Sequence, residues 1–187
     1  MWITVVENFH IPPGKLSELE AIENLVMGES AINAYTLQPL AHYAKLFTLE
    51  LTFAPPDNGS GGFKILETSP LEELETAAPP AGFDFDGRRR VYGAAEFIRS
   101  FSDRGHAHLF GFYVDEALRS RGAASWFLNR CEKALRLDYL ISAIDLSVAE
   151  DNLRAAAFYR KNGYSVSESV KDYYGSGRDR LIMNKKI

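Results

Sequence analysis

The segment from His108 to Leu128, HLFGFYVDEALRSRGAASWFL, constrains the fold more than any other stretch of the chain. Residues 108–114 are apolar and aromatic, which is typical of a β-strand. A short polar turn follows, and from Ala124 onward apolar residues recur at helical spacing. The sequence therefore predicts a strand, a tight loop and a helix in direct succession.

The loop between this strand and this helix has the chemistry of an anion site. The first turn of a helix carries unpaired backbone N–H groups and the positive end of the helix dipole. Three small residues open the helix, so a phosphate group can approach its backbone closely, and two arginines add positive charge. The residues predicted to bind a pyrophosphate are Arg119, Ser120, Arg121, Gly122, Ala123 and Ala124.

This loop carries a resemblance to a known family. The pattern Val-x4-Arg-x2-Gly-x-Ala, formed by Val114, Arg119, Gly122 and Ala124, resembles the acetyl-CoA pyrophosphate loop of the GNAT N-acetyltransferases. Glycine-rich turns between a strand and a helix also occur in other nucleotide-binding folds. The residues that follow the loop therefore decide between these readings.

A second region of resemblance lies in the next predicted strand and helix. Asn152 follows the strand predicted over residues 141–148, and Tyr159 lies seven residues later in a helix that Gly163 closes. Members of the GNAT family are similar in both the order and the spacing of these residues. The two motifs together identify residues 88–187 as the acetyl-CoA-binding core of a GNAT domain.

The resemblance implies an α/β (α+β) fold with a mixed, mostly antiparallel central sheet of about six or seven strands, flanked by helices on both faces. We predict a single domain over residues 1–187. Residues 1–87 match the family only in the order of their elements and include a long Pro- and Gly-rich excursion over residues 55–87. Within this divergent part, residues 47–53 alternate between apolar and polar side chains, which predicts a half-buried strand.

The resemblance also implies a reaction. In GNAT enzymes a primary amine attacks the thioester of acetyl-CoA directly, in a ternary complex. Here the backbones of Phe112, Tyr113 and Val114 would meet the pantetheine and the thioester, and Asn152 would hydrogen-bond the pantetheine arm. Tyr159 would protonate the leaving thiolate as the general acid.

The identity of the general base stays open at this point. N-terminal peptide acetyltransferases carry a glutamate five residues before the asparagine, where this chain has Ser147, which cannot accept a proton at neutral pH. Histone-modifying members carry the base eleven residues before the loop arginine, at the position of His108. Histidine side chains ordinarily titrate near pH 6.5, as a base requires. We predict His108 as the base, with Glu96 second and His106 third; a core histidine whose hydrogen bonds are satisfied is the alternative for His108.

The closing segment concerns the acceptor. Tyr173 and Tyr174 precede an Asp-x-Leu-Ile-Met strand, and this arrangement resembles the acceptor loop of N-terminal peptide acetyltransferases. We predict that both tyrosines bind the acceptor, which is a protein N-terminus or a small-molecule amine. Two other readings stay open: an acyl-CoA-binding or regulatory module with weakened catalysis, and an assembly subunit that uses residues 55–87 as an interaction arm.

Composition and charge restrict the partners and the compartment. The formal net charge is −4, which disfavours nucleic acid. The single cysteine, Cys131, excludes an intramolecular disulfide and is predicted to be a buried thiol. No apolar run reaches the roughly 20 residues that span a bilayer, and the N-terminus lacks a signal-peptide pattern. We predict a cytoplasmic protein that binds no membrane and no metal and that can form a homodimer.

Overall fold

A computed structural model describes residues 1–27, 32–54, 62–73, 91–119 and 122–187. The predicted pyrophosphate contacts Ser120 and Arg121, and most of the excursion over residues 55–87, lie outside the described residues. The described chain falls into two compact units. The first unit comprises residues 1–96 and 111–131, and the second comprises residues 97–110 and 132–187.

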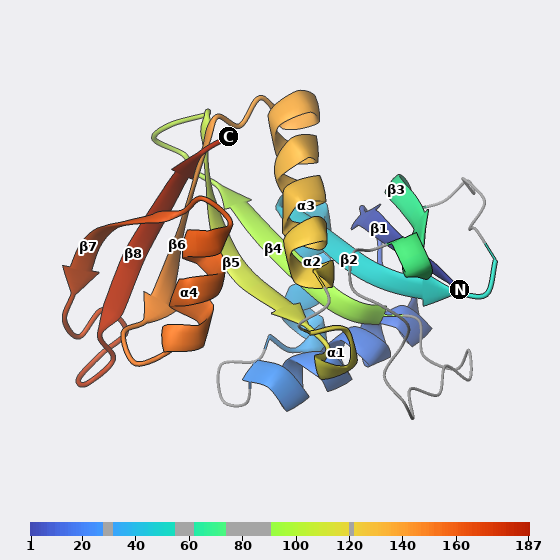
Figure 1. The fold of residues 1–187 in the computed structure, drawn as a ribbon, viewed down its shortest axis with the longest axis horizontal. Coiled ribbons are helices and arrows are strands. Elements are labelled where there is room, and N and C mark those ends of the chain that lie inside the picture. Colours follow the sequence, from blue (N-terminus) through green and yellow to red (C-terminus); the bar gives the residue numbers. More distant parts are fainter. Residues whose placement is uncertain (28–31, 55–61, 74–90, 120–121) are drawn as a thin grey trace. The chain divides into compact units, whose positions relative to one another are not determined.

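Eight strands pair in the order β3-β1-β2-β4-β5-β6-β8-β7 (Figure 1). Their bounds are β1 Trp2–Asn8, β2 Lys45–Thr52, β3 Phe63–Pro70, β4 Val91–Arg99, β5 His106–Val114, β6 Ala143–Ala149, β7 Ser165–Val170 and β8 Arg180–Lys186. The helices are α1 Pro13–Met27, α2 Ala34–Tyr43, α3 Ala123–Tyr139 and α4 Leu153–Lys161. The predicted α+β class is confirmed, with slightly more strands than the six or seven expected. The prediction that residues 1–187 form a single domain is not tested by these observations and stays a prediction.

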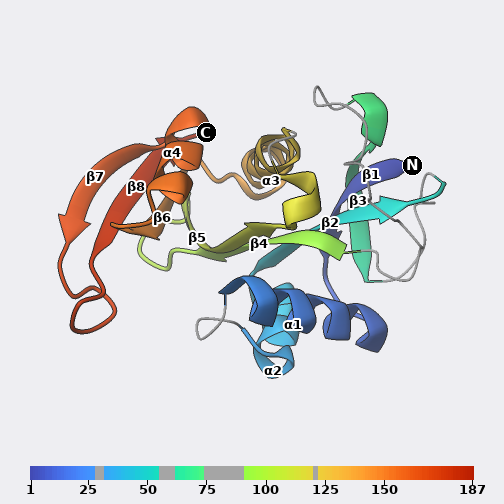
Figure 2. The same cartoon turned by 60° about the horizontal axis from the view of Figure 1, so that its bottom comes forward.

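The first unit contains β1, β2 and β3, which pair antiparallel with β1 between the other two, together with residues 91–96 of β4 and 111–114 of β5. Figure 2 shows α1 and α2 on one face of the strands of this unit and the first turns of α3 on the other. Leu19 and Ile22 on α1 and Leu37 on α2 are buried against Leu46 and Tyr113. Burying one such aliphatic side chain stabilises the fold by about 2 kcal/mol, so this cluster fixes α1 beneath the strands.

The expected half-burial of β2 is wrong, because its polar face is covered as completely as its apolar face. Thr48 is fully buried and Glu50 is 5% exposed. The hydroxyl of Thr48 accepts a hydrogen bond from Asn8 Nδ2 at 3.1 Å and donates one to Glu50 Oε1 at 2.8 Å. Lys15 on α1 forms an ion pair with the same carboxylate. Buried polar groups are tolerated where they are paired in this way.

The second unit is held by β6, which pairs parallel with β5 and antiparallel with β8. The parallel register places His108 opposite Asp145. Helix α4 lies against β6 in Figures 1 and 2. Below the strands, Glu132 is 5% exposed and accepts hydrogen bonds from Tyr164 Oη at 2.9 Å and Lys185 Nζ at 2.5 Å. These charge-assisted bonds satisfy a carboxylate that burial would otherwise destabilise.

The short helix α4 is defined by its ends. The side chain of Asn152 accepts a hydrogen bond from Ala155 N at 3.0 Å and so caps the first turn. Arg160 and Lys161 lie in the last turn, where positive charge complements the helix dipole. Gly163 follows with φ +89°, a conformation that L side chains rarely adopt, and confirms the predicted C-terminal stop.

The sequence also predicts a buried thiol and no apolar run long enough to span a bilayer. Cys131 is a free, buried cysteine, as predicted. Within the parts of the chain that the structure describes, no helix is long and apolar enough to cross a bilayer.

Candidate functional site

The predicted cofactor loop lies in the first unit, where β5 ends. The Asp115 side chain accepts a hydrogen bond from Ala117 N at 2.9 Å and caps a short 3₁₀ turn over Glu116–Leu118. Arg119 Nε then donates to Val114 O at 2.9 Å, which holds the arginine at the end of the strand. The rest of its guanidinium has no partner among the described residues, so it can contact a ligand.

The entrance to α3 is shaped for close approach of a ligand. Gly122 has φ +76° and its carbonyl accepts the hydrogen bond from Trp126 N at 2.9 Å. Because α3 begins at Ala123, its first N–H groups have no partner within the helix. A glycine in the left-handed region, an anchored arginine and a helix N-terminus fit a pyrophosphate in both charge and space. Arg119, Gly122 and Ala123 all lie at this junction between β5 and α3, and their role as pyrophosphate contacts stays a prediction.

Phe112 and Tyr113, at the end of β5, pack on opposite faces of the strand. The ring of Phe112 stacks on Phe127 of α3, with centroids 5.6 Å apart and planes 27° apart. Tyr113 is 3% exposed and packs in the cluster under α1 and α2, and Val114 is 5% exposed. Tyr113 and Val114 are thus buried and Phe112 is partly buried against α3, which leaves the strand backbone as the means of contact with a pantetheine chain.

Glu96 is a buried carboxylate of the first unit. It lies on β4, is 1% exposed, and neither carboxylate oxygen has a hydrogen-bond partner among the described residues. A Cβ at Gly111 would lie 2.4 Å from Glu96 Oε2, so only glycine leaves room for this carboxylate. Burial, and to a smaller extent the nearby Glu23 carboxylate, together raise the pKa of Glu96 to about 8.

Glu23 was not among the predicted site residues. It lies on α1, is 1% exposed, and its Oε2 accepts a hydrogen bond from Ile32 N at 3.1 Å. Burial raises the pKa of Glu23, and the hydrogen bond from Ile32 opposes part of this increase. A sequence signal existed: Glu23 lies four residues after Leu19 and one after Ile22, on the apolar stripe of the helix.

The second unit holds a different cluster of ionisable side chains. Asp145 on β6 contacts two histidines of β5: His106 Nε2 lies 2.6 Å from Asp145 Oδ2, and His108 Nδ1 bonds Asp145 Oδ1. All three side chains are about one-third exposed. Burial disfavours the ionised form of Asp145, but the hydrogen bonds from His108 and His106 outweigh it and lower the pKa of Asp145.

This cluster has a chemical consequence for His108. An ionised Asp145 can only accept hydrogen bonds, so Nδ1 of His108 carries its hydrogen toward the carboxylate. The lone pair of Nε2 is then available to accept a proton. A carboxylate that orients a histidine in this way also stabilises the imidazolium that forms. The His108 side chain is about one-third exposed and bonds a carboxylate, so it does not have the full burial that the alternative of a core histidine requires.

The predicted acceptor residues lie beside this cluster's strand. Tyr174 and Ser147 share a hydrogen bond of 3.1 Å between their hydroxyls, although Ser147 comes from β6 and Tyr174 from the loop after β7. Tyr173 and Tyr174 pack edge to face at 4.7 Å and are 45% and 48% exposed. Arg180 lies 5.1 Å over the ring of Tyr174. Two ordered and half-exposed tyrosines can bind a chain laid across them.

Asn152 and Tyr159 are both engaged within the second unit. The Oδ1 atom of Asn152 caps α4, and its amide nitrogen has no partner among the described residues, which leaves it to bind a ligand. Tyr159 is 9% exposed and packs edge to face with Phe158 and Tyr164. Burial raises the pKa of Tyr159 above its ordinary range, so this hydroxyl stays protonated.

Comparisons with known proteins show the family of the chain. Residues 49–164, more than half of the chain, match the Acetyltransferase (GNAT) family. An N-alpha-acetyltransferase of Saccharolobus solfataricus is 30% identical over 80 residues, 43% of this chain and 48% of that relative. This chain thus spans about half the length of the curated relative it matches. The chain belongs to the GNAT acetyltransferase family.

Solved structures show the same fold at low sequence identity. Arabidopsis thaliana NAA60 in complex with a bisubstrate analogue has a TM-score of 0.67 at 14% identity, over 98% of this chain and 99% of that one. An aminoglycoside 6'-N-acetyltransferase complexed with coenzyme A has a TM-score of 0.65 at 12% identity, over 97% of this chain and 96% of that one. Similarity at this level of sequence identity shows the fold and does not select the acceptor.

Proposed function

We propose that the protein is an acetyl-CoA-dependent N-acetyltransferase that moves an acetyl group to a primary amine. The observation that supports this most directly is the loop after β5, where Arg119 is anchored on Val114 and Gly122 opens α3 in the left-handed conformation. Arg119, Gly122 and Ala123 would hold the pyrophosphate, together with Ser120, Arg121 and Ala124. Acetyl-CoA supplies a thioester whose carbonyl carbon an amine can attack directly.

The favoured acceptor is the N-terminal amine of a polypeptide. The ordered pair Tyr173 and Tyr174 supports a peptide acceptor, and the Saccharolobus solfataricus relative is an N-alpha-acetyltransferase. A small-molecule amine is the second candidate, since the aminoglycoside enzyme has a similar fold. The predicted cytoplasmic location and homodimer stay predictions.

The chain offers two groups that can remove a proton from the acceptor ammonium. His108 has its ring oriented by Asp145, which favours proton uptake at Nε2. Glu96 is a buried carboxylate whose pKa of about 8 makes its ionised form a stronger base than an ordinary glutamate. Either group would take the role of the glutamate that N-terminal peptide acetyltransferases carry at the position of Ser147.

An alternative is a module that binds acyl-CoA without turnover. Its support is Ser147, whose hydroxyl is bonded to Tyr174 and cannot serve as a base. Mass spectrometry of the purified protein for bound CoA, followed by thiol detection with acetyl-CoA and a panel of acceptors, tests both readings. Release of CoA with free peptides, but not with the same peptides carrying an N-terminal acetyl group, is the result expected for the enzyme. Bound CoA without release for any amine would favour the module.

The role of Tyr159 gives a first prediction. If its hydroxyl protonates the leaving thiolate, Tyr159→Phe should lower kcat by about 10²-fold while the affinity for acetyl-CoA stays unchanged. Stopped-time thiol assays and calorimetry measure the two quantities. Phe158→Leu, which changes the neighbouring ring and keeps the hydroxyl, serves as the packing control. Wild-type turnover by Tyr159→Phe would make Tyr159 a packing residue only.

The cluster on β5 and β6 gives a second prediction. If His108 is the general base, Asp145→Asn should lower kcat by roughly 10-fold or more, because it keeps the shape of the side chain but removes the charge that orients and stabilises the His108 imidazolium. In the same case, the kcat of His108→Gln should fall at least as far. The double variant should be no slower than His108→Gln, since Asp145 acts through the histidine. Losses that multiply in the double variant would show that the two residues act separately.

A further inference from the structure

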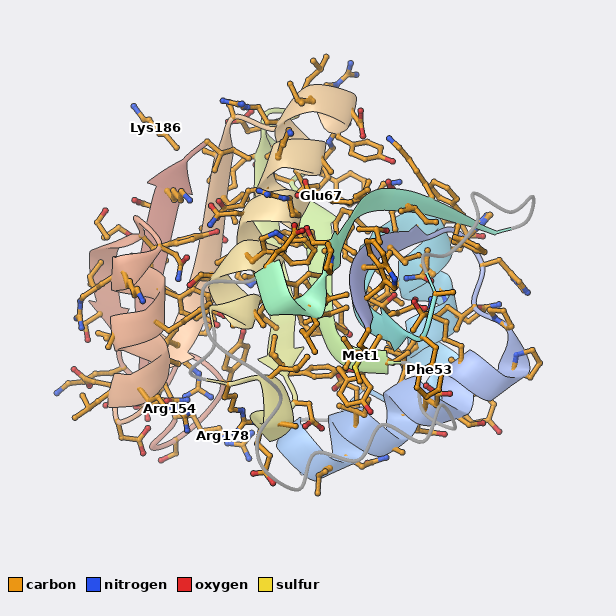
Figure 3. The ribbon with its side chains drawn as sticks, turned by 45° about the vertical axis from the view of Figure 1, so that its right-hand side comes forward. Met1, Phe53, Glu67, Arg154, Arg178 and Lys186 are labelled. Atoms are coloured by element: carbon orange, nitrogen blue, oxygen red, sulfur yellow. The ribbon has the colours of Figure 1, made fainter. Side chains whose placement is uncertain are left out.

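A cavity of about 310 Å³ lies within the first unit, among β1, β2, β3 and the start of α1. Figure 3 brings these elements to the front of the molecule. None of the residues around the cavity is among the predicted acetyl-CoA or acceptor contacts. Its volume is at the lower end of the range for ligand pockets, about 300–1,000 Å³, and suits a small metabolite.

One part of the cavity wall is a buried network of paired polar groups. Lys15 Nζ donates to Asn8 Oδ1 at 2.5 Å and to Glu50 Oε1. Asn8 is 1% exposed, and the side chains of Lys15 and Glu50 are 17% and 7% exposed. The third hydrogen of the Lys15 ammonium has no acceptor among the described residues. A partly buried ion pair thus lines the cavity, and one Lys15 hydrogen has no acceptor among the described residues.

The neighbouring histidine is held in a single tautomer. Gln38 Oε1 accepts the hydrogen bond from Ile11 N at 3.0 Å, so the amide nitrogen of Gln38 is the atom that lies 2.8 Å from His10 Nδ1. Nδ1 of His10 is therefore an acceptor, and its ring hydrogen is on Nε2. His10 lines the cavity as a neutral ring and adds no charge to the wall.

The rest of the wall sets the charge and the polarity of a ligand. Glu18 adds a second carboxylate, whose Oε2 accepts from Val91 N at 3.0 Å. Val6, Phe63 and Ile65 supply an apolar surface on β1 and β3. The cavity is therefore lined by one ammonium, two carboxylates and an apolar surface, which a single small molecule can contact together.

We propose that this cavity binds a free α-amino acid with an apolar side chain. The carboxylate of the ligand would accept the third hydrogen of Lys15, its ammonium would lie toward the carboxylates of Glu50 and Glu18, and its side chain would cover the apolar wall. A simple anion is repelled by the two carboxylates. A simple amine competes with Lys15 for Glu50 and leaves the Lys15 hydrogen unpaired. Only a zwitterion complements both signs of charge.

L-Leucine is the probe that tests this site, with two analogues that each lack one charge. Titration calorimetry and thermal unfolding should show binding of L-leucine and at least 10-fold weaker binding of N-acetyl-L-leucine and of isoamylamine. The first analogue lacks the ammonium and the second lacks the carboxylate. Equal binding of either analogue would overturn the proposal, as would no binding of leucine to the wild-type protein.

Two variants locate the binding. Ile65→Trp fills the cavity without touching the ion pair, and Lys15→Met removes the donor; both should lose leucine binding by at least 10-fold. Lys64→Met is the matched control, because it makes the same charge change on β3 outside the cavity, and it should bind leucine normally. Ile65→Trp also serves if Lys15→Met fails to fold, which circular dichroism reports.

The outcome must also separate this cavity from the acceptor site. Leucine binding that survives Ile65→Trp but is lost in Glu96→Gln would place the ligand at the acceptor site and overturn the proposal. The proposal does not depend on catalysis, since leucine binding to the cavity is expected even if no amine is acetylated.

Discussion

Gly122→Glu is expected to abolish acetyl-CoA binding while the protein stays folded. Gly122 has φ +76° immediately before α3, so its missing side chain leaves the helix N-terminus open to a pyrophosphate. A glutamate there adds bulk and a negative charge at the place where two phosphates must approach. Titration calorimetry with acetyl-CoA should detect no binding, and circular dichroism should match the wild type.

The control for this variant is Gly122→Ala. Both substitutions carry the cost of a left-handed backbone for an L residue, about 1–2 kcal/mol, but alanine adds no charge and little bulk. Gly122→Ala should therefore lose stability similarly and keep most of its affinity. If Gly122→Glu binds acetyl-CoA as tightly as Gly122→Ala, the loop does not hold the pyrophosphate and the proposed function fails with it.

The elements of the fold were predictable because their signals are local. The helix at α1 follows from apolar spacing between Leu16 and Val26, and the stop of α4 follows from Gly163. The burial of β2 was not predictable in this way. Its polar face is covered only because Asn8 and Lys15, distant in sequence, pair with Thr48 and Glu50. Pairing between distant residues leaves no periodic trace in a single sequence.

The same distinction applies to the candidate site. The strand and the helix on either side of the loop were predictable, because their apolar patterns are local, and the loop's role as a cofactor site stays a prediction. Asp145 was missed, since its role depends on the parallel register that sets it opposite His108. Glu23 was missed because a glutamate in a helix is ordinarily solvated, and only the packing of α1 buries it.

Glu96→Gln is expected to lower kcat/KM by about 10²–10⁴-fold at high pH if Glu96 is the general base. A base works only when ionised, so wild-type kcat/KM should rise with pH through an apparent pKa of about 8. In Glu96→Gln, the part of the rise in kcat/KM that comes from titration of the enzyme should disappear. In His108→Gln the rise should persist, because Glu96 still titrates. A rise that persists in Glu96→Gln and vanishes in His108→Gln would assign the role to His108.

The acceptor amine titrates in the same range, since an α-amino group has a pKa of about 7.7–8.0. Glu23→Gln separates the two contributions. Removing the Glu23 carboxylate removes a like charge that raises the pKa of Glu96, so the rise should move to lower pH. The titration of the peptide substrate cannot respond to this substitution. A pH profile unchanged by both Glu23→Gln and Glu96→Gln belongs to the substrate alone.

Protein stability provides a test of Glu96 that needs no substrate. Its pKa is about 8 in the folded protein and ordinarily 4.5, so the folded state binds the proton more tightly than the unfolded state. Stability from this group is complete below about pH 4.5 and is lost as pH rises toward 8, by about 1.4 kcal/mol for each pH unit. Chemical unfolding across this window should show the decline in the wild type and its loss in Glu96→Gln. Equal slopes in both proteins would mean that Glu96 is solvated and ionised at neutral pH, and the argument for a basic buried carboxylate would fall.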